Sequence, residues 1–410
     1  MYHVYLDGVL VGTLTPDRGR IAFRYATDAA LDAGGIPLSV RLPRRGEPYG
    51  DADARPFFEN LLPEAEFRRL LAAQLRLSAG NTAGLLGEIA GECAGAASIW
   101  PASEQPPDRP SYHEISADEL RRLFATPDDP ALVAAQRRGR LSLAGVQPKL
   151  TLKRDGDRWL LGERGAATTH ILKRTHVGAP YLVENEFFCM KLAAASGLDV
   201  PEVERVDAGV PLLAVKRFDR IADENGIHRV HQEDFCQATG TLPAAKYEAE
   251  GGPTLERCAA VLREHSALPI ADVRLLLEWV AFNYFVGNED AHAKNLALLY
   301  RVDGLRLAPF YDLVSTIVYR GLSRKAAMAI GGERRYAYVE RRHWERLASA
   351  VRVPWPAVRR AVADIGERMT VALDGVQEQT VANFGEVSLL DDVVASVRVR
   401  IEKGSLISRL

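Results

Sequence analysis

The stretch GNEDAHAKNLALLY, residues 287–300, gathers two carboxylates, a histidine, a lysine and two asparagines between two hydrophobic segments. Before it comes LLLEWVAFNYFV, residues 275–286, whose continuous apolar character predicts a buried helix. After it comes LALLYRVDGLRLAPFYDLVST, residues 296–316, which predicts a β-hairpin followed by an irregular loop. The polar residues are therefore expected in a loop held rigidly between two buried elements.

The spacing within this loop fits phosphoryl transfer, a reaction that depends mainly on positioned charge. Asp290 precedes Asn295 by five residues, the separation between the catalytic-loop aspartate and the metal-binding asparagine of protein kinases. Asp312 follows the hairpin, and we expect it to return to the same cleft. Asn295 and Asp312 would then hold Mg²⁺, which prefers oxygen ligands. Either residue alone is also common in helix caps and turns, so the inference depends on the set.

Two upstream segments are candidates for contacts to a nucleotide. RLSLAGVQPKL, residues 140–150, has Gly145 in a polar turn and Lys149 at the start of a strand, but it is neither a Walker A sequence nor GxGxxG. Lys173 lies on the predicted strand THILKR, residues 169–174, where kinases carry their phosphate-binding lysine. A single glycine or a lysine at a strand end is weak evidence by itself.

Composition restricts the class of protein. The chain has 410 residues, a formal net charge of -2 and a pI near 6.5, which gives no overall argument for binding nucleic acid or an anionic membrane. The four cysteines are widely spaced without a CxxC pair, as expected for buried free thiols in the cytoplasm. The N-terminal segment predicts a hairpin with a DG turn and not a signal peptide, and residues 275–286 are too short to span a bilayer. A domain boundary is expected at the proline-rich PASEQPPDRP, residues 101–110.

Motifs spread over nearly the whole chain resemble the HipA family of bacterial serine/threonine kinase toxins. The motifs are FFENLLPE (57–64), SLAGVQPKL (142–150), THILK (169–173), ENEFFCMKLA (184–193), VKRFDR (215–220), HQEDFCQATG (231–240), NEDAHAKN (288–295), PFYDLVST (309–316) and AMAIGG (327–332). They keep the family's order, so they are specific as a set.

The resemblance implies a role for each matching position. It makes Asp290 the proton acceptor, Asn295 and Asp312 the Mg²⁺ ligands, and Lys173 the lysine on the ATP phosphates. The remaining ATP-binding positions that it implies are Ala144, Gly145, Val146, Gln147, Pro148, Lys149, Lys216, Arg217, Phe218, His292, Ala293, Lys294 and Tyr311. Residues 215–218 would hold the adenine through backbone groups.

The resemblance also implies a control point at Ser142, because family members autophosphorylate a serine at this place. A phosphate there adds nearly two negative charges and would keep the loop out of the ATP pocket. Two positions depart from the family, since relatives can carry an acidic residue at Pro148 and Glu at Lys216. Glu184 and Glu186 are both candidate partners of Lys173, and the sequence does not choose between them.

The resemblance implies an α+β chain with a bilobal protein-kinase-like fold of the PI3/4-kinase type. Residues 1–105 would form an N-terminal subdomain, 106–218 the kinase N-lobe and 219–410 a helical C-lobe. The expected partners are a protein substrate, by family precedent an aminoacyl-tRNA synthetase such as the glutamyl enzyme, and a small helix-turn-helix antitoxin of HipB type. DNA would be contacted only through the antitoxin complex, and no membrane is expected.

Three alternatives stay open at this stage. The chain could serve mainly as a corepressor on an antitoxin, or as a small-molecule phosphotransferase, since those enzymes share the aspartate–asparagine spacing. A transition-metal site on Asp290 and His292 is the weakest, because no further Cys or His cluster completes it.

Overall fold

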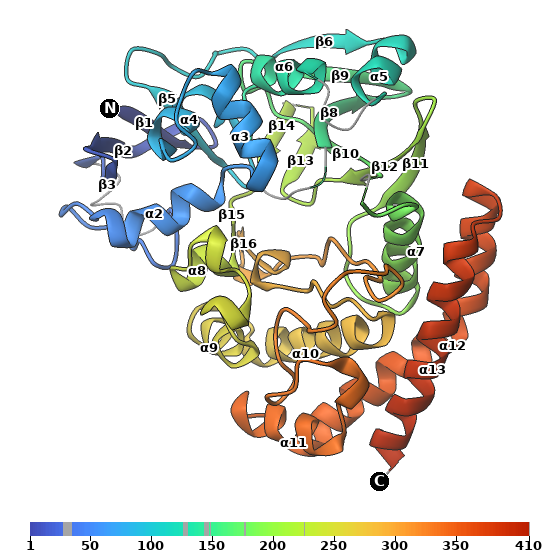
Figure 1. Ribbon diagram of the computed structural model, residues 1–410. Coiled ribbons are helices and arrows are strands. Elements are labelled where there is room, and N and C mark those ends of the chain that lie inside the picture. Colours follow the sequence, from blue (N-terminus) through green and yellow to red (C-terminus); the bar gives the residue numbers. More distant parts are fainter. Residues whose placement is uncertain are drawn as a thin grey trace. The chain divides into compact units, whose positions relative to one another are not determined.

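The computed structural model describes residues 1–27, 35–125, 130–142, 147, 149–175, 178–224 and 226–409. The chain divides into two compact units (Figure 1). Unit 1 comprises Met1–Arg174, Asp207–Ala244 and Leu299–Val302, and unit 2 comprises Thr175–Val206, Ala245–Leu298 and Asp303–Leu410. Both strands and helices occur, so the chain is a mixed α/β protein. The three-domain division at residues 105 and 218 stays a prediction.

Unit 1 begins with an antiparallel sheet in the order β3-β2-β1-β5. Its strands are β1 (Tyr2–Leu6), β2 (Val9–Asp17), β3 (Arg20–Tyr25) and β5 (Ala97–Pro101). Asp7 and Gly8, with φ of 45° and 80°, form the turn between β1 and β2, which confirms the predicted DG hairpin.

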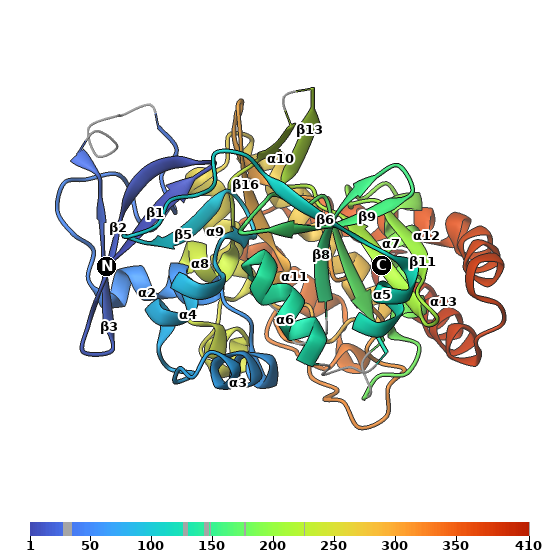
Figure 2. The ribbon, with the colours of Figure 1, turned by 90° about the horizontal axis from the view of Figure 1, so that it is seen from above.

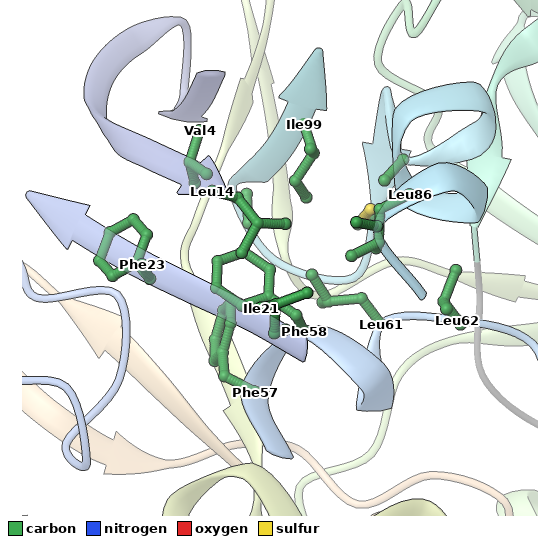
Figure 3. Packing of buried hydrophobic residues seen from close by; sticks show 14 of the residues in the cluster. Val4, Leu14, Ile21, Phe23, Phe57, Phe58, Leu61, Leu62, Leu86 and Ile99 are labelled. Atoms are coloured by element: carbon green, nitrogen blue, oxygen red, sulfur yellow. The ribbon is translucent and has the colours of Figure 1, made fainter. Parts of the chain in front are cut away.

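Three helices accompany this sheet: α2 (Asp51–Asn60), α3 (Ala65–Gln74) and α4 (Thr82–Ile89). Figure 3 shows Phe57 and Phe58 of α2 directed into the same core as Ile21 and Ile99 of the sheet. The apolar residues around 55–77 therefore do form a buried helical face. The helical segment is split in two near Pro63, because the residue before a proline is disfavoured in the helical conformation.

A second sheet of unit 1 includes antiparallel strands in the order β12-β10-β8-β9-β6. They are β6 (Ser111–Ile115), β8 (Lys149–Asp155), β9 (Arg158–Glu163), β10 (His170–Arg174) and β12 (Pro211–Lys216), and the predicted strands in this region are thereby confirmed. α5 (Ala117–Leu123) precedes α6 (Pro130–Gly139), which packs on β8 and β9 (Figure 2). The remaining elements of unit 1 are β4 (Glu92–Cys93), β7 (Leu141–Ser142), β13 (Arg220–Asp223), β14 (Gly226–Arg229), β15 (Gln232–Asp234) and α8 (Phe235–Thr239).

Buried polar contacts join distant segments within unit 1. Glu233 is fully buried and accepts hydrogen bonds from Ser39 Oγ at 2.6 Å and from Tyr300 Oη at 2.6 Å. Burial raises the pKa of Glu233 to about 7, although the Ser39 and Tyr300 hydrogen bonds act in the opposite direction.

Unit 2 is mainly helical. Its helices are α7 (Leu182–Ala195), α9 (Leu255–His265), α10 (Pro269–Val286), α11 (Arg341–Ala350), α12 (Trp355–Phe384) and α13 (Ser388–Arg409). α12 packs against α7, α10 and α13, and it runs beside α13 in Figure 1. The chain also forms β11 (Val203–Asp207), β16 (Ala297–Arg301) and β17 (Gly304–Leu307), with Ala308 N donating to Ala297 O at 2.9 Å. The predicted buried helix at 275–286 and the strand pair after residue 296 are confirmed.

The four cysteines are buried free thiols, as predicted, and none of the described helices is both long and apolar enough to cross a bilayer.

Candidate active site

The loop after α10 is held by a chain of side-chain hydrogen bonds. The helix ends at Gly287, which adopts φ 71°, and a Cβ there would lie 2.6 Å from Ile317 Cγ2, so glycine suits this position on both counts. Asn288 is buried, donates from Nδ2 to Asn283 Oδ1 at 2.8 Å and accepts at Oδ1 from Asp290 N at 3.2 Å. The amide of Asn288 thus ties the loop to the end of the buried helix.

Asp290 lies at the exposed tip of this loop. Its Oδ1 accepts a hydrogen bond from Tyr247 Oη at 2.9 Å. Among the described residues, no side chain donates to the other carboxylate oxygen, Oδ2. Asp290 can therefore meet an incoming group from solvent, as a general base must.

A single turn of 3₁₀ helix, η3 (Ala293–Asn295), follows Asp290. His292, Lys294 and Asn295 are each at most 8% exposed, and Asn295 N donates to His292 O at 2.9 Å. The polar residues of this turn are therefore fixed in a compact arrangement and do not form a solvated loop.

The segment around Asp312 lies next to this turn. Tyr311 Oη donates to Lys294 O at 2.7 Å, which brings the residues that precede Asp312 and Asn295 into direct contact. Asp312 itself has φ 54°, a left-handed conformation that is uncommon outside glycine and concentrates at functional sites. Ser315 N donates to Asn185 Oδ1 at 2.8 Å and so anchors the segment to α7. An amide and a carboxylate from these two segments are suitable oxygen ligands for Mg²⁺.

Glu289, to which the sequence assigned no role, is a structural residue of the loop. Its N–H donates to Thr316 Oγ1 at 2.8 Å and its carbonyl accepts from Ala327 N at 2.8 Å. Burial raises the pKa of its carboxyl group, and Arg324 lies 3.8 Å away. These contacts fasten the AMAIGG motif to the loop that carries Asp290.

The predicted phosphate-binding lysines lie in unit 1. Lys173 of β10 is 5% exposed and is the direct cross-strand partner of Lys149 of β8. Directly opposed residues of an antiparallel pair point to the same face, so these two cationic side chains lie on one face of the sheet. Gln147 Nε2 donates to Arg174 O at 2.8 Å, while Ala144, Gly145, Val146 and Pro148 lie outside the described residues.

The predicted adenine segment combines exposed and buried positions. Lys216 is exposed at the end of β12, and Phe218 is half-buried. The Arg217 side chain instead points into unit 1, where Nη1 contacts Glu92 at 2.8 Å, and its N–H donates to Thr169 O at 2.9 Å. The Arg217 side chain and its backbone N–H are thus used in contacts within unit 1.

Ser142 is fully buried on β7, which pairs in parallel with β4. Its Oγ donates to Leu61 O at 2.6 Å. In this conformation the hydroxyl is inaccessible to any reagent, so a modification of Ser142 requires β7 to leave its place.

Tyr247 is the residue of this site that the sequence did not indicate. It lies more than forty residues before Asp290, in a segment with no recognisable motif, and only the folded chain brings the two together. Within the described part of the chain, no three His, Cys, Asp or Glu side chains gather into a metal-binding group.

Comparisons with known proteins identify the family of the chain. Residues 2–100 match the model of the HipA N-terminal domain, and residues 141–373 match that of the HipA-like C-terminal domain. Y4mE of Sinorhizobium fredii is 43% identical over 387 residues, which cover 92% of each chain. The serine/threonine-protein kinase toxin HipA of Shewanella oneidensis is 33% identical over 347 residues, 80% of this chain and 78% of that one.

The fold agrees as well. HipA in the solved complex of Shewanella oneidensis HipA, HipB and operator DNA superposes with a TM-score of 0.87 at 28% identity and covers both chains completely. The same family is thus indicated by both family models, by a relative above 30% identity and by a full-length structural match. The chain belongs to the HipA family and is a HipA-family kinase.

Proposed function

We propose that the chain is an ATP- and Mg²⁺-dependent protein serine/threonine kinase that acts as the toxin of a type II toxin–antitoxin pair in the cytoplasm. The observation that carries this proposal is the Tyr311–Lys294 hydrogen bond, which joins the Asp312 segment to the turn that contains Asn295. The two units would act as the lobes of a PI3/4-kinase-like fold. ATP supplies the γ-phosphoryl group and Mg²⁺ neutralises its charge.

In this proposal the chain's own residues have separate roles. Lys149 and Lys173 would hold the phosphates, and the Asn295 amide and Asp312 carboxylate would hold Mg²⁺. Asp290 would orient the acceptor hydroxyl and take its proton, because this aspartate is exposed to solvent. By family resemblance the acceptor would be an aminoacyl-tRNA synthetase, such as the glutamyl enzyme, whose inactivation would halt translation.

We expect the purified protein, given ATP and Mg²⁺, to gain one phosphate at Ser142 and then to lose most of its kinase activity. A phosphate cannot occupy the buried site beside Leu61 O, so the modified strand would stay away from β4 and the loop that follows it would leave the nucleotide. Intact-mass spectrometry with peptide mapping gives the measurement, with Ser142→Ala as the unmodifiable control. Wild-type protein that binds ATP and stays unmodified would refute the self-phosphorylation step.

A second role is supported by the structural match to a complex of HipA with HipB and operator DNA. We propose that the chain binds a helix-turn-helix antitoxin of HipB type and contacts DNA only through it, since a net charge of -2 disfavours direct binding. Adding the chain to antitoxin on operator DNA should tighten the complex in a mobility-shift titration, whereas the chain alone should leave the DNA unshifted. An unchanged antitoxin affinity would contradict the corepressor role.

A further inference from the structure

The segment Ala245–Gly252 of unit 2 places a phenol against the candidate base. Tyr247 Oη donates to Asp290 Oδ1 at 2.9 Å. The Tyr247 ring also meets His292 edge-on, with centroids 5.5 Å apart and an interplanar angle of 73°. One side chain therefore contacts two residues of the catalytic loop.

The backbone around Tyr247 is fixed on both sides. Glu248 N donates to Ala327 O at 3.0 Å, and Glu248 Oε2 accepts from Ala329 N at 2.6 Å. Gly252 N donates back to Tyr247 O at 2.9 Å, and a Cβ at Gly252 would collide with Ala245 O. The tyrosine is thus held in place by the AMAIGG segment and by a closed turn, and is not carried on a loose loop.

The same AMAIGG segment is fastened to the catalytic loop, because Ala327 N donates to Glu289 O at 2.8 Å. Tyr247 and Asp290 are therefore attached, a few residues apart, to one common support. A shared support fixes the distance between the phenol and the carboxylate, whereas the terminal torsion of an aspartate is otherwise broad.

We propose that Tyr247 is a positioning residue for the phosphoryl transfer. Its hydroxyl occupies Asp290 Oδ1, so that Oδ2 is presented to the hydroxyl of the protein acceptor. The inference rests on the proposed kinase function. In the reaction the acceptor O–H proton passes to Asp290, the acceptor oxygen forms a bond to the γ-phosphorus, and the bond to the leaving ADP oxygen breaks. Tyr247 keeps its proton throughout.

Tyr247→Phe removes only the phenolic oxygen and should lower kcat about tenfold, the effect of one hydrogen bond to a charged group. The KM values for ATP and for the protein acceptor, and the Kd for ATP, should stay within about twofold of wild type. Tyr338→Phe is the matched control, because Tyr338 is 57% exposed in the same unit and its ring stacks on the surface residue Arg335. Glu248→Ala, which releases the support of the segment, should change kcat in the same direction as Tyr247→Phe.

The outcomes separate the possibilities. An active wild type with a Tyr247→Phe variant of equal kcat would overturn the positioning role alone. A lower KM for the acceptor at unchanged kcat would also overturn it, since the phenol would then be a competitor of the acceptor hydroxyl. A wild type that binds ATP yet phosphorylates neither itself nor an added protein would overturn the proposed function, and the positioning role with it. Thermal unfolding and ATP binding show that the variants are folded.

Discussion

Asp290→Ala is expected to lower phosphoryl transfer by about 1,000-fold, within the range of 10²–10⁴ that positioned general bases contribute. The carboxylate is the only proposed acceptor for the hydroxyl proton, and alanine leaves the remaining nucleotide contacts in place. Asp290 is exposed, so its removal should leave the fold unchanged. Transfer of ³²P from ATP to Ser142 or to a trapped protein acceptor gives the rate.

Asp303→Ala is the matched control, since Asp303 is also an exposed aspartate of unit 2, in the turn between β16 and β17. This variant should keep the wild-type rate. Phosphoproteomics after brief induction of wild type and of Asp290→Ala would then identify the acceptor as the phosphosite present in the first sample only. An Asp290→Ala rate above about one tenth of wild type would exclude the general-base role.

Glu92→Gln is expected to destabilise unit 1 by about 3–5 kcal/mol, because it leaves the buried guanidinium groups of the cluster with only the Asp219 carboxylate, which pairs with Arg217 and Arg220, to offset their charge. The Glu92 carboxylate is fully buried and contacts Arg217 at 2.8 Å, Arg220 at 3.0 Å and Arg229 at 2.9 Å. Glu92 lies on β4 in the region that matches the N-terminal HipA domain, and the arginines lie in the region that matches the C-terminal one. Urea unfolding at pH 7 gives the difference in the free energy of unfolding.

The contribution of Glu92 to the free energy of unfolding should decrease at low pH. Burial alone would raise the pKa of Glu92, but the charges of Arg220, Arg217 and Arg229 outweigh it and lower the pKa to about 2. The Glu92 carboxyl group therefore releases its proton more readily in the folded state than in the unfolded chain. Its ionised form contributes about 3 kcal/mol to the free energy of unfolding above pH 4.5, and this contribution is lost as the pH falls to 2. The difference in the free energy of unfolding between wild type and Glu92→Gln should therefore decrease as the pH falls from 4.5 to 2.

An exposed pair provides the control for the buried one. Glu163 contacts Arg138 at the surface of unit 1, and Glu163→Gln should cost under about 1 kcal/mol. Equal destabilisation by Glu92→Gln and Glu163→Gln would contradict the assigned importance of the buried cluster.

The order of elements could be predicted from the sequence because it depends on local patterns. The DG turn at Asp7–Gly8, the buried helix at 275–286 and the hairpin that follows residue 296 come from turn chemistry and apolar runs, and the structure confirms them. The spacing of Asp290 and Asn295 is equally local. The sequence by itself thus determined the order of helices and strands and where the candidate loop lies in that order.

Contacts between distant segments were decided only by the tertiary structure. No local pattern shows that Tyr247 reaches Asp290, that Ser142 donates to Leu61, or that the Arg217 side chain is directed to Glu92. Each pairing depends on which buried polar groups lie within hydrogen-bonding distance once the elements have packed. A buried polar group that lacks a hydrogen bond costs free energy, so such pairings are favoured. The sequence indicated candidate residues for the chemistry, and packing determined which neighbours hold them in place.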